Sequence, residues 1–94
     1  MDDQEFNQIE HLTKKGDLLG LRAWLDGGGD PNLSNEFGWT PLMLAALHGR
    51  TDFAQALVSR GADPDRQNEF GDTAKALALA KGFASTARAM ESST

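Results

Sequence analysis

Few side chains in this sequence have the type and spacing that catalysis requires. The chain has two histidines, His11 and His48, and neither cysteine nor tyrosine. Histidine is the usual general acid or base, but these two do not occupy equivalent positions of the repeat described below, so the repeat does not bring them together. Ser34, Ser59 and Ser85 stand in no nucleophile motif. We therefore predict that the protein is not an enzyme. The alternative would need an activity that is abolished by changing either histidine.

Carboxylates and glycines are the other candidates for a ligand site. Asp30, Asp63 and Asp65 could bind calcium, but each lies in a predicted loop, where a short polar side chain bonds backbone amides and sets the turn. Nothing nearby supplies the six or more oxygens that calcium takes. The glycine run 27–29 follows a predicted helix, whereas a phosphate-binding loop precedes one. We therefore expect no metal and no cofactor.

The charge balance and hydropathy limit the class of partner. Nucleic-acid affinity depends on Lys and Arg, and the formal net charge is −5, so we expect no nucleic-acid partner. No stretch approaches the roughly 20 apolar residues of a membrane span, so we expect no membrane. The first residues, MDDQEFNQ, lack the basic segment and apolar run of a secretion signal. Together these features predict a single small soluble domain in the cytoplasm.

The stretch 37–49, FGWTPLMLAALHG, contains the most apolar helix expected in the chain. Thr40 can cap a free backbone N–H, and Pro41 suits the first helical position because it has no N–H to lose. The residues between Pro41 and Gly49 are apolar almost all round, so a helix over 41–48 needs neighbours on several sides. Gly49 is expected to end this helix.

The same unit recurs 33 residues later. This shift places residues 35–38, NEFG, on residues 68–71 and Thr40 on Thr73. A fixed period in this range is typical of a stacked repeat array. In these residues, and above all in the stretches GWTPLMLAALHG and RGADPD, the sequence resembles the ankyrin repeat family. The resemblance covers nearly the whole chain and implies an all-α solenoid of stacked antiparallel helix pairs with projecting β-turn fingers.

The resemblance divides the single domain, 1–94, into three units. Residues 1–35 form an N-terminal capping repeat that lacks the finger motif and the Thr-Pro helix start. Residues 36–68 form one complete internal repeat. Residues 69–94 form a C-terminal capping repeat with a short disordered tail, ESST. In this last unit Lys75 replaces the leucine of the pattern, which suits a helix that faces water at the end of the stack.

Two further expectations concern the internal unit. We predict its second helix over 52–60, with Thr51 and Asp52 as cap and anion at the start and with Gly61 ending it. Met43 stands at the position where the family has histidine, so a side-chain hydrogen bond that the resemblance would imply is lost.

The resemblance also implies a set of partner-contacting residues. In the family, partners usually contact the residues that flank the finger glycine and those that end the first helix of each repeat. Carried over to this sequence, they are Glu36, Phe37, Trp39, Leu47 and His48 in the middle repeat, and Glu69, Phe70, Asp72, Ala80 and Lys81 in the last repeat. Exposed aromatic side chains ringed by carboxylates resemble an interaction hot spot with a polar rim. The alternative is that the two phenylalanines only pack finger against finger and stabilise the stack.

The resemblance to ankyrin repeats implies a non-catalytic protein–protein interaction module whose partner is a protein. We expect this module to be a monomer. Two alternatives stay open. The first is an inhibitor or immunity-type protein in which Glu36, Glu69 and Asp72 mask a basic site on an enzyme. The second is a structural protein that self-associates through its fingers or its ends.

Overall fold

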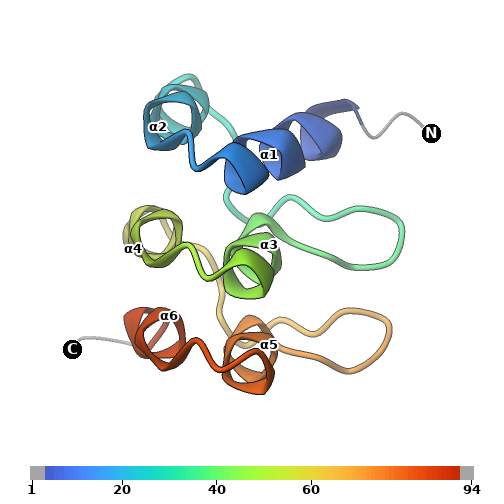
Figure 1. Cartoon of the computed structure of the whole chain (residues 1–94). Coiled ribbons are helices and arrows are strands. Elements are labelled where there is room, and N and C mark those ends of the chain that lie inside the picture. Colours follow the sequence, from blue (N-terminus) through green and yellow to red (C-terminus); the bar gives the residue numbers. More distant parts are fainter. Residues whose placement is uncertain (1–3, 92–94) are drawn as a thin grey trace.

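The computed structural model describes residues 4–91, which form helices and loops without a strand. The helices come in consecutive pairs that stack in chain order (Figure 1). Their bounds are α1 (Gln4–Lys15), α2 (Leu18–Asp26), α3 (Pro41–His48), α4 (Thr51–Ser59), α5 (Ala74–Ala80) and α6 (Ala84–Ala89). The predicted all-α stack of antiparallel helix pairs is therefore confirmed.

The helices form two layers, with α1, α3 and α5 in one and α2, α4 and α6 in the other (Figure 1). The two loops that precede α3 and α5 project on the side of the first layer (Figure 1). Helix α3 lies in the middle of its layer and contacts α1, α4 and α5. Its residues 41–46 are all buried, as expected for a helix that is apolar almost all round.

Local signals set the ends of α3. The hydroxyl of Thr40 accepts a hydrogen bond from the backbone N–H of Met43 at 3.3 Å, which satisfies one of the free donors at the helix start. At the other end Gly49 adopts the left-handed conformation, with φ of 65°. Thr73 caps α5 in the same way, through the N–H of Ala76 at 3.1 Å. Both ends of α3 agree with the prediction from the sequence.

The start of α4 differs from the prediction. The helix begins at Thr51 and ends at Ser59, one residue earlier than the predicted range 52–60, and its cap position is Arg50, without a side-chain cap hydrogen bond. The Thr51 hydroxyl lies 2.8 Å from the hydroxyl of Thr86 in α6. A contact with the next helix pair therefore replaces the expected local cap.

The first two helix pairs are tied together by side chains that bond to backbone groups of the neighbouring pair. Arg50 donates from Nε to the carbonyl oxygen of Thr13 at 2.9 Å and from Nη2 to that of Lys14 at 2.7 Å. Carbonyls of the last turn of a helix have no partner within the helix, so the guanidinium satisfies the end of α1. Asn32 bonds to the backbone of Gly61 and Asp63 in the corresponding loop of the next pair.

The division of the chain into units 1–35, 36–68 and 69–94 stays a prediction, with one helix pair falling in each unit. The predicted disordered tail reaches residues 92–94, which lie outside the described residues. Glu91 is described, and its carboxylate forms an ion pair with Lys75 at 2.9 Å.

Candidate functional site

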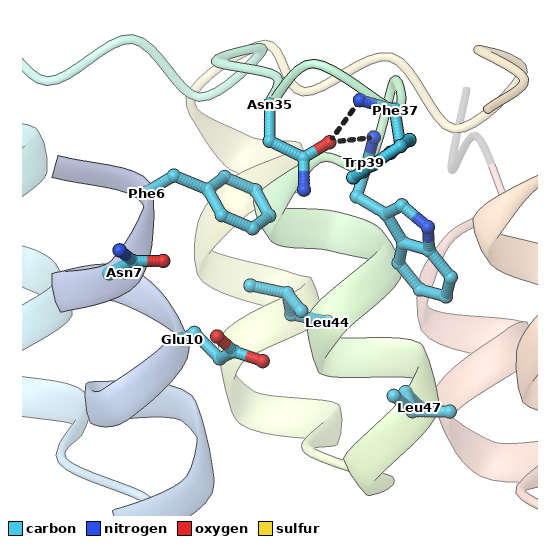
Figure 2. A pocket seen from close by; sticks show the side chains of 8 residues that line it. All are labelled: Phe6, Asn7, Glu10, Asn35, Phe37, Trp39, Leu44 and Leu47. Carbon is cyan, nitrogen blue, oxygen red and sulfur yellow. Dashed lines mark hydrogen bonds between the residues drawn. The ribbon is translucent and has the colours of Figure 1, made fainter. Parts of the chain in front are cut away.

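The two projecting loops are fingers, residues 35–39 and 68–72, and an asparagine side chain closes each of them. In the first finger, Asn35 Oδ1 accepts from the N–H groups of Phe37 at 2.9 Å and Trp39 at 3.0 Å (Figure 2). In the second, Asn68 Oδ1 accepts from Phe70 at 2.9 Å and Asp72 at 3.1 Å. A short amide side chain that bonds amides further along its own loop fixes a tight turn, so both fingers are held in one conformation.

The two fingers lie against each other through backbone atoms. The N–H of Glu69 donates to the carbonyl oxygen of Phe37 at 3.0 Å. A Cβ atom on Gly38 would come within 3.0 Å of the Cα atom of Asn68, so only glycine allows this approach. Asn68 is 6% exposed, and its Nδ2 atom has no hydrogen-bond partner among the described residues.

The aromatic side chains of the fingers differ in exposure. Phe37 is 48% exposed and Phe70 is 71% exposed, whereas Trp39 is half-buried and packs against the hydrophobic core. The hydrogen bond that joins the fingers uses backbone atoms only. Both phenylalanine rings therefore offer apolar area to solvent, and their contact with a partner stays a prediction.

A groove of about 260 Å³ lies between α1, the first finger and α3 (Figure 2). Helix α1 contributes three of the lining residues, which are Phe6, Asn7 and Glu10. The others come from the first finger and from α3, and they are Asn35, Phe37, Trp39, Leu44 and Leu47. We call this site the α1–finger groove.

The α1–finger groove offers both apolar and polar surface. The ring of Phe6 and the side chain of Leu44 form its base, and the carboxylate of Glu10 and the amide nitrogen of Asn35 point toward its centre (Figure 2). Glu10 also lies 3.8 Å from the Nζ atom of Lys14, one helical turn further along α1, in a largely exposed pair. The accessible surface of the groove is therefore about equally polar and apolar, whereas pockets for small molecules are mostly apolar.

The structure brings only some of the predicted contact residues together at this groove. Phe37, Trp39 and Leu47 line it. The remaining ones lie outside its lining, with His48 and Asp72 half-buried and the others exposed, namely Glu36, Glu69, Phe70, Ala80 and Lys81.

The lining residues that the sequence analysis missed are Phe6, Asn7, Glu10, Asn35 and Leu44. Most of them lie on α1, whose sequence lacks the finger motif and the Thr-Pro start, so no carried-over position pointed to it. The spacing of Phe6 and Ile9, both buried, is the signal that marks the inward face of this helix.

The candidates for chemistry stay dispersed. His11 is exposed on α1, and His48 is half-buried at the end of α3. In the described part of the chain, no group of three or more His, Asp or Glu residues is placed to hold a metal ion. Likewise, no helix of residues 4–91 is long and apolar enough to cross a bilayer.

The predicted turn-setting role applies to two of the three loop aspartates. Asp30 Oδ1 accepts from the N–H of Asn32, and Asp63 Oδ1 accepts from that of Asp65, both at 2.9 Å. Asp65 differs from the prediction, because it contributes its backbone N–H to the turn and its side chain is not the acceptor there.

The comparisons with known proteins agree with this architecture. A sequence model of the family described as ankyrin repeats (3 copies) matches residues 10–91. A search of curated proteins found no match to the chain. Ankyrin repeats are generally protein–protein interaction modules, and the family is typically non-catalytic. The matched range covers most of the chain, and the three copies agree with the three stacked helix pairs, so the chain belongs to the ankyrin repeat family.

Proposed function

We propose that the protein is a non-catalytic protein–protein interaction module that holds a partner protein against its finger tips and helix ends. The observation that carries the proposal is the exposure of Phe37 and Phe70 on two fingers of fixed conformation. The proposed contact surface consists of Glu36, Phe37, Trp39, Leu47, His48, Glu69, Phe70, Asp72 and Lys81.

Two physical arguments support this surface. Aromatic side chains bury a large area at a low cost in side-chain entropy, and they dominate the energetics of many interfaces. The asparagine-closed turns hold the fingers in place before binding, so little backbone entropy is lost when a partner docks. Glu36 and Glu69 are exposed and directly precede Phe37 and Phe70 in the chain, which supports a polar rim beside the aromatic rings.

Affinity capture from native cell extract with a Phe37→Ala/Phe70→Ala variant tests the proposal. Both rings are exposed, so the variant is expected to keep its helical circular dichroism spectrum. A partner held by these anchors should bind about 30-fold more weakly, corresponding to about 2 kcal/mol. Leu19→Ala is the matched control, since Leu19 is 80% exposed on α2 in the other layer. If the folded double variant retains every partner as well as the control does, the finger site is wrong.

A second candidate is a protein that masks a basic site on an enzyme. It is favoured by the exposed carboxylates of Glu36 and Glu69 on neighbouring fingers. Attraction between charges at the rim of an interface is screened by salt, so association should weaken several-fold between about 50 and 500 mM salt. Association that does not change over this range would exclude this version.

The monomeric state and the cytoplasmic location belong to the same proposal. Light scattering over a wide concentration range tests the first. A mass that rises with concentration would favour the self-associating alternative instead.

A further inference from the structure

We propose that the α1–finger groove binds an extended basic segment of the partner, with one apolar side chain in the groove and a neighbouring Lys or Arg paired with Glu10. This inference rests on the proposed function, because it names the chemistry of the partner at one part of the interaction surface.

The groove arises from a difference between α1 and the other helices of its layer. The 33-residue register extends to the first pair, since Gly16, Gly49 and Gly82 all adopt positive φ after a helix of this layer. In this register Phe6 and Asn7 correspond to Trp39 and Thr40. Trp39 and Thr40 precede α3, whereas Phe6 and Asn7 lie inside α1. The first finger therefore has the first turn of α1 on one side and the second finger on its other side.

The first finger carries backbone and side-chain donors for an extended segment. In the second finger the N–H of Glu69 donates to Phe37 of the neighbouring finger. The equivalent N–H, that of Glu36, makes no hydrogen bond with the residues at 4–91. Asn35 uses its oxygen within the finger, while its amide nitrogen points into the groove (Figure 2). Two carbonyl groups of an incoming chain can accept from these donors, in the way that the first finger accepts from the second.

The size of the groove favours one side chain of a larger partner. Its volume of about 260 Å³ lies below the roughly 300–1,000 Å³ of pockets that enclose a small molecule. Phe6 and Leu44 at its base are almost fully buried, whereas Phe37 is exposed and Trp39 is half-buried, so an apolar side chain gains by leaving water against these two aromatic rings.

The charge of the groove favours a basic residue of the partner next to the apolar side chain that enters the groove. Glu10 supplies the formal charge among the lining residues, and the whole chain has a net charge of −5. The pair between Glu10 and Lys14 spans 3.8 Å and is largely exposed, so it holds the carboxylate weakly. A Lys or Arg beside the buried apolar side chain can pair with this carboxylate at the groove, and an acidic segment would be repelled.

An array of acetylated nonapeptides tests the proposal directly. Each peptide carries one Leu or Phe among Ser and Gly residues, with one Arg at varied spacing, and matched versions replace the Arg by Gln or the apolar residue by Ser. The best peptide is titrated into ¹⁵N-labelled protein. We expect chemical-shift changes at the Asn35 side-chain amide, the Glu36 N–H and the Trp39 indole. Replacing Arg by Gln should weaken binding about threefold, and replacing the apolar residue by Ser should weaken it about tenfold or more.

Two variants assign the effect to the groove. Glu10→Gln should remove the preference for Arg over Gln. Asp65→Asn makes the same charge change at an exposed loop residue that lies outside both the groove and the proposed contact surface, and should preserve the preference. Asn7 is exposed on α1, so Asn7→Trp should fill the groove while leaving the core intact, and Asn7→Ala controls for the loss of the amide. Only the tryptophan variant should lose peptide binding.

The outcomes separate this inference from the proposed function. It is overturned if no peptide of the array binds, or if the shifts map to another surface. It is also overturned if a captured partner stays bound to Asn7→Trp and Glu10→Gln while Phe37→Ala/Phe70→Ala releases it, and in that case the proposed function stands. If no partner depends on either set of variants, the proposed function itself fails.

Discussion

Residues of one type have different roles in this protein according to what surrounds them. The hydroxyls of Thr40 and Thr73 cap the helices that follow them. The hydroxyl of Thr51 instead forms a hydrogen bond with that of Thr86 in the neighbouring helix pair. Asn35 and Asn68 close equivalent turns, but only Asn35 keeps its amide nitrogen at a groove that a partner can reach. The neighbour in space therefore decides the role of each residue.

The guanidinium of Arg50 is expected to stabilise the junction of the first two helix pairs. Arg50→Ala removes two hydrogen bonds to the final carbonyls of α1 and should lower the free energy of unfolding by about 1–3 kcal/mol. Arg50→Lys should recover only part of this, because an ammonium group lacks the planar fork that reaches both carbonyls.

Urea unfolding measures the effect of these Arg50 variants. Arg22→Ala serves as the control, since Arg22 is exposed on α2 and should change stability by no more than about 0.5 kcal/mol. Equal losses for the Arg50→Ala and Arg22→Ala variants would show that the capping contact contributes nothing.

The ion pair between Glu91 and Lys75 predicts a pH-dependent contribution to stability. The hydrogen bond from Lys75, and then its positive charge, hold the pKa of Glu91 below its ordinary value of 4.5. A carboxylate whose pKa is lowered by folding stabilises the folded state above the pKa of the unfolded chain, and this contribution disappears as the pH falls through the folded pKa. Glu91→Gln should therefore lower the melting temperature slightly at pH 7 and leave it unchanged well below pH 4.

Thermal unfolding of wild type and variant at a series of pH values tests this expectation. Glu36→Gln is the control, because Glu36 is exposed on the first finger and has no ion pair within the described residues. If the melting temperatures of wild type and Glu91→Gln still differ at low pH, the cause is not the ion pair.

At the scale of the elements, the fingers and α1 decide what the first helix layer presents to a partner. The two fingers share one turn, with φ of 81° at both Gly38 and Gly71, but they differ in their neighbours. The first finger lies between α1 and the second finger, and the backbone of Asn68 approaches Gly38 closely. The spacing of the fingers is therefore set by a glycine.

Alanine at the two finger glycines should have unequal effects. A Cβ atom at position 71 meets no atom within 4 Å, so Gly71→Ala should lower the free energy of unfolding only by the strain of a positive φ, about 1–2 kcal/mol. Gly38→Ala has the same strain and must also move the fingers apart, which weakens the bond from Glu69 to Phe37 and should cost about 1 kcal/mol more.

Denaturant unfolding of both variants, with exchange of the Glu69 amide hydrogen, measures this difference. Faster exchange at Glu69 is expected in the Gly38→Ala variant alone. Equal stability and equal exchange in both would mean that the fingers are not coupled through this contact.

At the scale of the whole molecule, the protein is a short linear stack in which each pair contacts its neighbours. Helix α3 contacts α1, α4 and α5, while α5 exposes Lys75, Ala76 and Leu79 at the end of the described stack. In a stack of this kind stability is approximately a sum over units and their interfaces. The central pair therefore has the most stabilising contacts.

Hydrogen exchange of the native protein should follow this order. The amides of α3 are expected to exchange about tenfold or more slowly than those of α6, which belongs to a terminal pair and contacts mainly α4 and α5. Residue-resolved exchange by NMR measures both sets. Uniform exchange rates over α3 and α6 would instead indicate that the stack opens as one cooperative unit.

The sequence alone determined the all-α repeat fold, the range of α3 and the position of the fingers. Thr40, Pro41 and Gly49 act on backbone groups within a few residues, and the NEFG turns recur at a fixed period, so these features needed no knowledge of distant contacts. Part of the candidate site followed from the same repeat, because Phe37, Trp39 and Leu47 lie at carried-over positions and do line the groove.

Only the tertiary structure decided how α1 contributes to the groove and to the contacts between helix pairs. Phe6 and Glu10 meet the first finger across about 30 residues of sequence, Arg50 reaches the end of α1, and Thr51 bonds to Thr86 in place of its own helix. Such contacts depend on how neighbouring pairs stack. The spacing of Phe6 and Ile9 marks the inward face of α1, but no local pattern states that this face meets the finger. Local hydrogen bonding therefore determined the elements, and packing between the pairs determined the groove.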